Sequence, residues 1–144
     1  MGSIDGSPFG AVSGALWAGA PDDPTTTVVY VFSKPVACSD LQNPGWDTKV
    51  PEGTRVLEMK AFGSDLRTYT VVTTPTPAPG EASVNYTLSS QTATPMEESS
   101  RAGDVSLAGL TPKTSVQGTF SLTFASSTLA GTFDAVFCPG GHEP

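Results

Sequence analysis

The alternation of apolar and polar residues between Ser115 and Phe137 restricts the fold of this chain more than any other feature. Apolar residues or glycines occupy every second position over residues 115–125, and after a short break the same period returns over residues 128–137. A period of two is that of a β-strand with one buried face. Two such runs of about ten residues, joined by a short turn, predict an antiparallel hairpin.

The apolar face of this hairpin is expected to be the centre of stability. Thr132 and Asp134 are predicted to point outward, Asp134 towards solvent or towards a cross-strand partner such as Thr119 or Thr123. The two glycines of the apolar face are expected to mark bulges or places where another backbone comes close. The predicted inward set is Val116, Gly118, Phe120, Leu122, Phe124, Leu129, Gly131, Phe133, Ala135 and Phe137.

Six further runs of apolar or alternating residues, separated by turn signals, are predicted to be strands. Two of them, residues 54–62 and 66–73, are predicted to pair as a hairpin across the turn at residues 63–65. The polar stretch 91–103 is expected to be an exposed, mobile loop. The six predicted strands are residues 9–18, 25–33, 54–62, 66–73, 82–88 and 104–110.

Eight candidate strands without a helical period indicate an all-β chain. We expect a single-domain antiparallel β-sandwich or flattened barrel of about eight strands. Nearly half of the 144 residues are Gly, Pro, Ser or Thr, which argues against a helical bundle. Residues 1–8 are expected to be a flexible segment that begins with an expression scar, residues 9–139 to be the β domain, and residues 140–144 to be a flexible tail.

The strand predicted at residues 25–33 differs from the others because its apolar run from Val28 to Phe32 is unbroken. Such a run is typical of a central strand that is covered on both faces, or of one whose outer face is shared with another element. The following stretch, residues 36–53, contains two prolines and is expected to be a long loop. Trp46 in this loop is predicted to fold back over the edge of the core.

The charge and the apolar pattern exclude some partners. The net charge of −7 disfavours binding to a phosphate backbone, so no nucleic-acid partner is expected. No run of about 18 apolar residues occurs, so no transmembrane segment is predicted. The chain has no glycine-rich phosphate-binding motif and no Cys-x-x-Cys pair, so neither a cofactor nor a metal is expected.

Two cysteines, Cys38 and Cys138, lie 100 residues apart. Low charge together with abundant Thr, Ser and Gly is common in exported proteins, and two cysteines in such a chain predict one disulfide. Both cysteines follow apolar runs, so they could meet at one end of the sheet. The alternative is two free buried thiols in a cytosolic protein.

Candidate catalytic residues are few. The one histidine, His142, lies in a glycine-rich end of the chain that would not hold a catalytic base in place. The pairs Asp22-Asp23 and Glu97-Glu98 could serve acid–base chemistry or bind calcium, but adjacent residues of an extended chain point apart. We therefore interpret them as solubilising charges at turns.

Two other motifs have a functional and a structural interpretation. Asn85-Tyr86-Thr87 matches the glycosylation sequon, which we interpret as a chance match. Five aromatic residues could form a platform for a carbohydrate, although core packing is the interpretation that we favour. They are Trp17, Tyr30, Trp46, Tyr69 and Tyr86.

Residues 118–138 read GTFSLTFASSTLAGTFDAVFC. This ending resembles that of small exported lipoproteins of myxobacteria and related bacteria, which close with G-x-F-x-x-x-F and then L-x-G-x-F-x-A-x-F-C. Residues 28–41, VVYVFSKPVACSDL with Ser33 and Cys38, and the Tyr69-Thr70-Val71 strand also resemble segments of that group. The resemblance implies an exported domain of uncharacterised function whose two cysteines are paired. Lipid anchoring, which it also implies, would need an N-terminal cysteine removed with the natural start of the chain.

Two functional hypotheses follow from the sequence. The first is a non-enzymatic exported or cell-envelope domain, in the periplasm, in the outer membrane or at the cell surface. It would bind an unknown protein or glycan of the cell surface, or act as a structural unit of an assembly. The alternative is a hydrolase or a calcium-dependent binding module that uses loop carboxylates. The absence of a recognisable catalytic set favours the first.

Overall fold

The computed structural model describes residues 3–4, 7–8, 14–18, 26–43, 45–46, 49–90, 96–125 and 127–139, with side chains from residue 26 onward. The described residues are mostly in β-strands, with almost no helix. Its strands are β1 (Ser3–Ile4), β2 (Ser7–Pro8), β3 (Gly14–Ala18), β4 (Thr27–Phe32), β5 (Arg55–Ala61), β6 (Thr68–Val71), β7 (Glu81–Leu88), β8 (Met96–Ser99), β9 (Ala102–Thr111), β10 (Ser115–Thr123) and β11 (Thr128–Phe137), with one helical turn, α1 (Cys38–Leu41).

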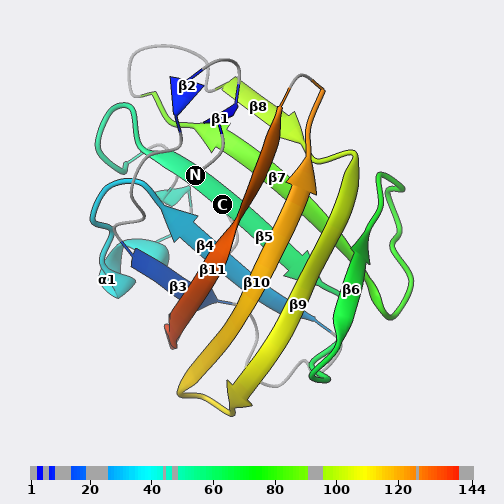
Figure 1. Cartoon of the computed structure of the whole chain (residues 1–144). Helices are drawn as coiled ribbons and strands as arrows, with labels where there is room; N and C mark the ends of the chain where they lie inside the picture. The colour runs from blue at the N-terminus through cyan, green and yellow to red at the C-terminus, as the bar shows by residue number, and fades with distance from the viewer. Residues whose placement is uncertain are drawn as a thin grey trace.

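Nine strands form one sheet in the order β5-β4-β3-β11-β10-β9-β6-β7-β8. A further pairing of β5 with β7 nearly closes eight of them into a flattened barrel, and β8 lies beside β7 outside this ring. Figure 1 shows β9, β10 and β11 crossing in front of β4, β5 and β7. The all-β, single-domain prediction is confirmed, and the eight strands of the ring correspond to the eight strands expected from the sequence.

Side chains from both walls fill the interior of the barrel. The terminal hairpin pairs from Ser115↔Val136 to Thr123↔Thr128. As predicted, its apolar residues point into the interior and alternate with residues that face the outer surface. Phe120 and Phe133 are each only 5% exposed. The interior cluster consists of Val29, Val31, Leu57, Met59, Ala61, Tyr69, Val71, Ala82, Val84, Tyr86, Val105, Leu107, Val116, Phe120, Leu122, Phe124, Leu129, Phe133 and Ala135.

The two glycines of the hairpin stand where larger residues would collide. A Cβ atom on Gly118 would meet the backbone oxygen of Ser106 and the ring of Phe133, and the register with β9 shifts between Gln117 and Gly118. A Cβ atom on Gly131 would lie 3.0 Å from the Phe120 ring. The predicted bulge and close approach are confirmed at Gly118.

Strand β4 is buried on both faces, which confirms the interpretation of its unbroken apolar run. Its inward residues, Val29 and Val31, join the interior cluster. On its outer face, Tyr30 and Phe32 pack against Trp46, whose ring centroid lies 5.0 Å from that of Tyr30 and 5.8 Å from that of Phe32. This smaller outer core contains Val28, Tyr30, Phe32, Leu41, Trp46, Val50, Val56 and Cys138.

The hairpin predicted between residues 54–62 and 66–73 is wrong. Strand β5 pairs along its whole length with β7, from Arg55↔Leu88 to Ala61↔Ala82, whereas β6 pairs antiparallel with β9 and parallel with β7. The physical reason is length: β7 offers β5 seven residue pairs, and the four residues of β6 could offer far fewer. Sequence order therefore did not give spatial order here.

The stretch 91–103 is also not the loop that its polar composition suggested. Within it, β8 pairs with β7 from Asn85↔Ser99 to Leu88↔Met96, and β9 already begins at Ala102; residues 91–95 lie outside the described residues. Three of the four residues of β8 are polar, since this strand lies outside the ring, where most of its side chains meet solvent.

Three smaller features were not predicted. Strand β1 pairs with β2 within the N-terminal segment expected to be flexible. Helix α1 provides one helical turn, begun by the Asp40 carboxylate accepting a hydrogen bond from the Ala37 N–H at 2.9 Å. The pairs β3–β11 and β6–β7 are parallel, although antiparallel neighbours dominate as expected.

Candidate functional site

The predicted disulfide joins Cys38 and Cys138, with Cα atoms 5.4 Å apart. It connects α1 to the end of β11, and Cys138 belongs to the outer core. Gln42 donates a hydrogen bond of 2.9 Å to the Pro139 carbonyl beside it. The pairing is confirmed and the free-thiol alternative is wrong. Disulfides form and persist outside the reducing cytoplasm, so the bond indicates a non-cytoplasmic protein.

Among the carboxylates considered as catalytic or calcium-binding groups, Glu98 has a structural partner. Glu98 accepts a hydrogen bond of 3.0 Å from the Ala125 N–H, which joins β8 to the turn between β10 and β11. Glu97 is exposed on β8. Asp22, Asp23 and His142 lie outside the described residues.

Asp134 points outward from β11, as predicted, but its partner is different. Its carboxylate accepts a hydrogen bond of 3.0 Å from the Gln117 amide, not from Thr119 or Thr123. The reason is the register, which places Gln117 directly opposite Asp134. The amide of Gln117 also donates to Ser115.

The aromatic residues do not form a surface platform among the described side chains. Tyr30, Trp46, Tyr69 and Tyr86 are each at most 1% exposed, which confirms the interpretation as core residues. The side chain of Trp17 lies outside the described residues. Tyr69 donates a hydrogen bond to the Asp65 carbonyl at 2.9 Å. Its burial, together with the nearby Asp65 carboxylate, raises the pKa of the Tyr69 phenol.

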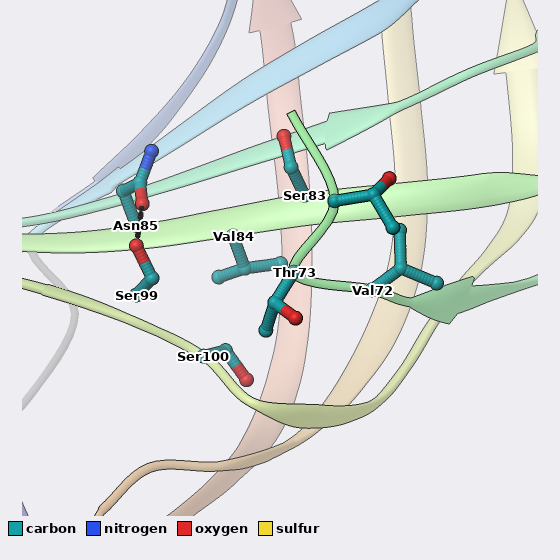
Figure 2. A pocket seen from close by; sticks show the side chains of 8 residues that line it. Val72, Thr73, Ser83, Val84, Asn85, Ser99 and Ser100 are labelled. Carbon is teal, nitrogen blue, oxygen red and sulfur yellow. Dashed lines mark hydrogen bonds between the residues drawn. The ribbon is translucent and has the colours of Figure 1, made fainter. Parts of the chain in front are cut away.

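A pocket of about 200 Å³ opens in the barrel wall where β6 and β8 meet the same edge of β7 (Figure 2). Strand β6 pairs there with Glu81 and Ala82, and β8 pairs from Asn85 onward. Ser83 and Val84 lie between the residues of β7 that pair with β6 and those that pair with β8. Six polar residues line the pocket, namely Thr73, Thr74, Ser83, Asn85, Ser99 and Ser100.

Backbone hydrogen bonds border this gap on both sides. The Ala82 carbonyl accepts a hydrogen bond from Val72 at 2.9 Å, and the Val84 carbonyl accepts one from Ser100 at 2.8 Å. The Ser100 hydroxyl donates to the carbonyls of Ala102 and Thr123. The pairings of β7 with β6 and with β8 provide no partner for the Val84 N–H, which points to this edge of β7.

The polar side chains of the pocket differ in how much of their hydrogen-bonding capacity is used. Ser99 donates to the Asn85 side-chain oxygen at 2.7 Å, as Figure 2 shows. The hydroxyls of Thr73, Thr74 and Ser83 make no hydrogen bond within the described part of the chain. The sequence did not predict this pocket. Its one signal in the sequence is Asn85, which is part of the sequon.

Neither a metal cluster nor a membrane-spanning helix is found in the described residues. No group of three or more His, Cys, Asp or Glu side chains there lies close enough together to hold a metal ion. No described helix is long and apolar enough to cross a membrane.

No family model matches the chain, and no curated protein or solved structure matches it.

Proposed function

We propose that this chain is a non-enzymatic binding domain of the cell envelope or of the exported protein fraction. Three features support the proposal. The disulfide fits an oxidising compartment, the barrel interior is filled by core side chains, and the polar pocket lies on the outer wall of the sheet. With the interior filled, recognition has to take place on the outer surface.

The chemistry of the pocket carries the proposal. All of its polar side chains are Ser, Thr or Asn, which donate and accept hydrogen bonds but do not titrate near neutral pH. A general acid or base needs a pKa near the working pH. The pocket therefore has the groups that bind a neutral polar ligand and lacks an acid–base pair among its own lining residues.

The test measures binding and turnover side by side. The immobilised protein is incubated with soluble glycans and with envelope proteins of a myxobacterium, and binding is followed by interferometry. A broad hydrolase screen with metal analysis is run on the same preparation. We expect saturable binding without turnover. Turnover that Glu97→Gln or Asp134→Asn abolishes would overturn the proposal in favour of the hydrolase.

A further inference from the structure

The gap in the β7 edge is short. Only Ser83 and Val84 lie between the residues paired with β6 and those paired with β8. Val84 points into the barrel, where its side chain is 2% exposed, so Ser83 and Asn85 point outward on either side of it. The pocket is consequently an outward-facing hollow in the wall, bounded on both sides by backbone that the neighbouring strands hold in place.

The groups facing this hollow are suited to hydroxyl groups. Thr73, Thr74 and Ser83 each offer one donor and two acceptor lone pairs, and the Asn85 amide offers two donors. No charged residue lines the pocket. On the next strand, Lys60 lies opposite Ser83 and Glu58 lies opposite Asn85, so that strand brings one charge of each sign. A neutral ligand with several hydroxyl groups matches this set better than an anion or a cation.

The length of the gap disfavours the other neutral polar ligand, an extended peptide. A peptide that adds to a sheet needs a continuous free edge along which its main chain forms a ladder of hydrogen bonds. Here β6 and β8 occupy the edge on both sides of the two-residue gap. A compact ligand needs no such edge. The pocket volume of about 200 Å³ is the space of roughly seven water molecules.

We propose that this pocket binds a single neutral sugar residue, such as one at the end of a surface glycan. The proposal rests on the binding function above and specifies its ligand. Hydrogen bonds from Thr73, Thr74, Ser83 and Asn85 hold the sugar. No aromatic side chain lines the pocket, so stacking does not contribute. For a ligand of this size we expect a Kd on the order of 1 mM.

The experiment is a titration of the ¹⁵N-labelled full chain, followed by amide chemical shifts. The probes are the methyl glycosides of glucose, galactose, mannose and N-acetylglucosamine, each in both anomers, up to about 50 mM. We expect at least one glycoside to give saturable shifts that are largest at Thr73, Thr74, Ser83 and Val84. Glycerol tests general affinity for hydroxyl groups, and a Ser-Thr-Ser tripeptide tests binding of a peptide.

Matched variants assign the binding to the pocket. Thr74→Val and Thr132→Val make the same change of hydroxyl to methyl, the first at the pocket and the second on the exposed outer face of β11. We expect Thr74→Val and Asn85→Ala each to weaken binding about threefold to tenfold, the effect of one lost hydrogen bond. Thr132→Val should leave the Kd unchanged within a factor of two.

Four results would overturn the inference. The first is that no glycoside causes chemical shift changes, and the second is that glycerol reproduces the changes. The third is that only the peptide causes changes. The fourth is that Thr132→Val weakens binding as much as Thr74→Val does. Failure here is distinguishable from failure of the proposed function. If the glycosides do not bind but the protein still binds an envelope component, the sugar pocket is wrong and the binding function stands.

Discussion

Phe133→Ala should remove a large part of the stability of the domain. Phe133 is 5% exposed and belongs to the interior cluster, and its ring packs against Gly118 of the neighbouring strand. Burial of a Phe side chain contributes about 2–3 kcal/mol. The cavity left by a lost ring of about 80 Å³ adds about 2 kcal/mol at roughly 24 cal/mol per Å³. The expected destabilisation is therefore about 4–5 kcal/mol, against a typical total of about 5–15 kcal/mol.

Urea melts followed by circular dichroism and tryptophan fluorescence measure this change. If Phe133→Ala does not fold, Phe133→Leu still reports the burial, with an expected loss of about 1–2 kcal/mol. Glu97→Ala is the surface control and should change the free energy of unfolding by about 0.5 kcal/mol or less. A Phe133→Ala variant that melts like the parent would refute the assignment of this face to the barrel interior.

The other predictions concern the Glu98 carboxylate, the close approach at Gly118, the disulfide and the Tyr69 phenol. Glu98→Ala should cost about 1 kcal/mol more than Glu97→Ala in urea melts, because it leaves the Ala125 N–H without its carboxylate; equal effects would contradict this role. Gly118→Ala should lower the melting temperature, since its Cβ would meet the Ser106 carbonyl, and an unchanged melting curve would exclude that contact. Replacing both cysteines by serine should destabilise the fold by about 2–5 kcal/mol, and intact mass should rise by two hydrogens on reduction of the parent; native alkylation of two thiols would reject the bond. The pKa of the Tyr69 phenol is raised in the folded state, so the protonated phenol stabilises the fold. This contribution is complete below the unfolded pKa of about 10 and is lost as pH rises through the folded value. Tyr69→Phe should abolish this part of the loss of stability at alkaline pH.

The sequence predicted the strands of the barrel well because their side-chain period is a local property. Val116, Phe120 and Leu122 alternate with polar residues, and one strand suffices to show which face is buried. The unbroken run of β4 likewise predicted a second packed layer, which Trp46 supplies.

Pairing between strands depends on competition across the whole sheet, which local pattern does not contain. Residues 66–73 looked like the partner of residues 54–62 because a short turn joins them, yet the longer β7 takes that edge of β5. Strand β8 escaped prediction because a strand outside the ring needs no apolar face.

The pocket was missed for the same reason. It consists of the ends of two strands that approach one edge of β7 from opposite directions, and its residues are the ordinary Ser, Thr and Asn of a polar surface. Asn85 attracted notice only through its sequon. Nothing in the sequence brings Thr74 close to Ser99, because the parallel pairing of β6 with β7 that does so is itself not predictable from the turns.

The central claim is that this chain binds a neutral polar ligand at the β6–β8 gap and leaves it chemically unchanged. The most direct test is equilibrium dialysis with the tightest-binding methyl glycoside, labelled with ¹³C. The ligand retained by the protein is quantified and its mass is measured after recovery. The account predicts retention of about one ligand per chain at saturation, weaker retention by Thr74→Val and a recovered mass identical to that of the added glycoside. A recovered mass that differs, or retention that Thr74→Val does not reduce, would contradict it.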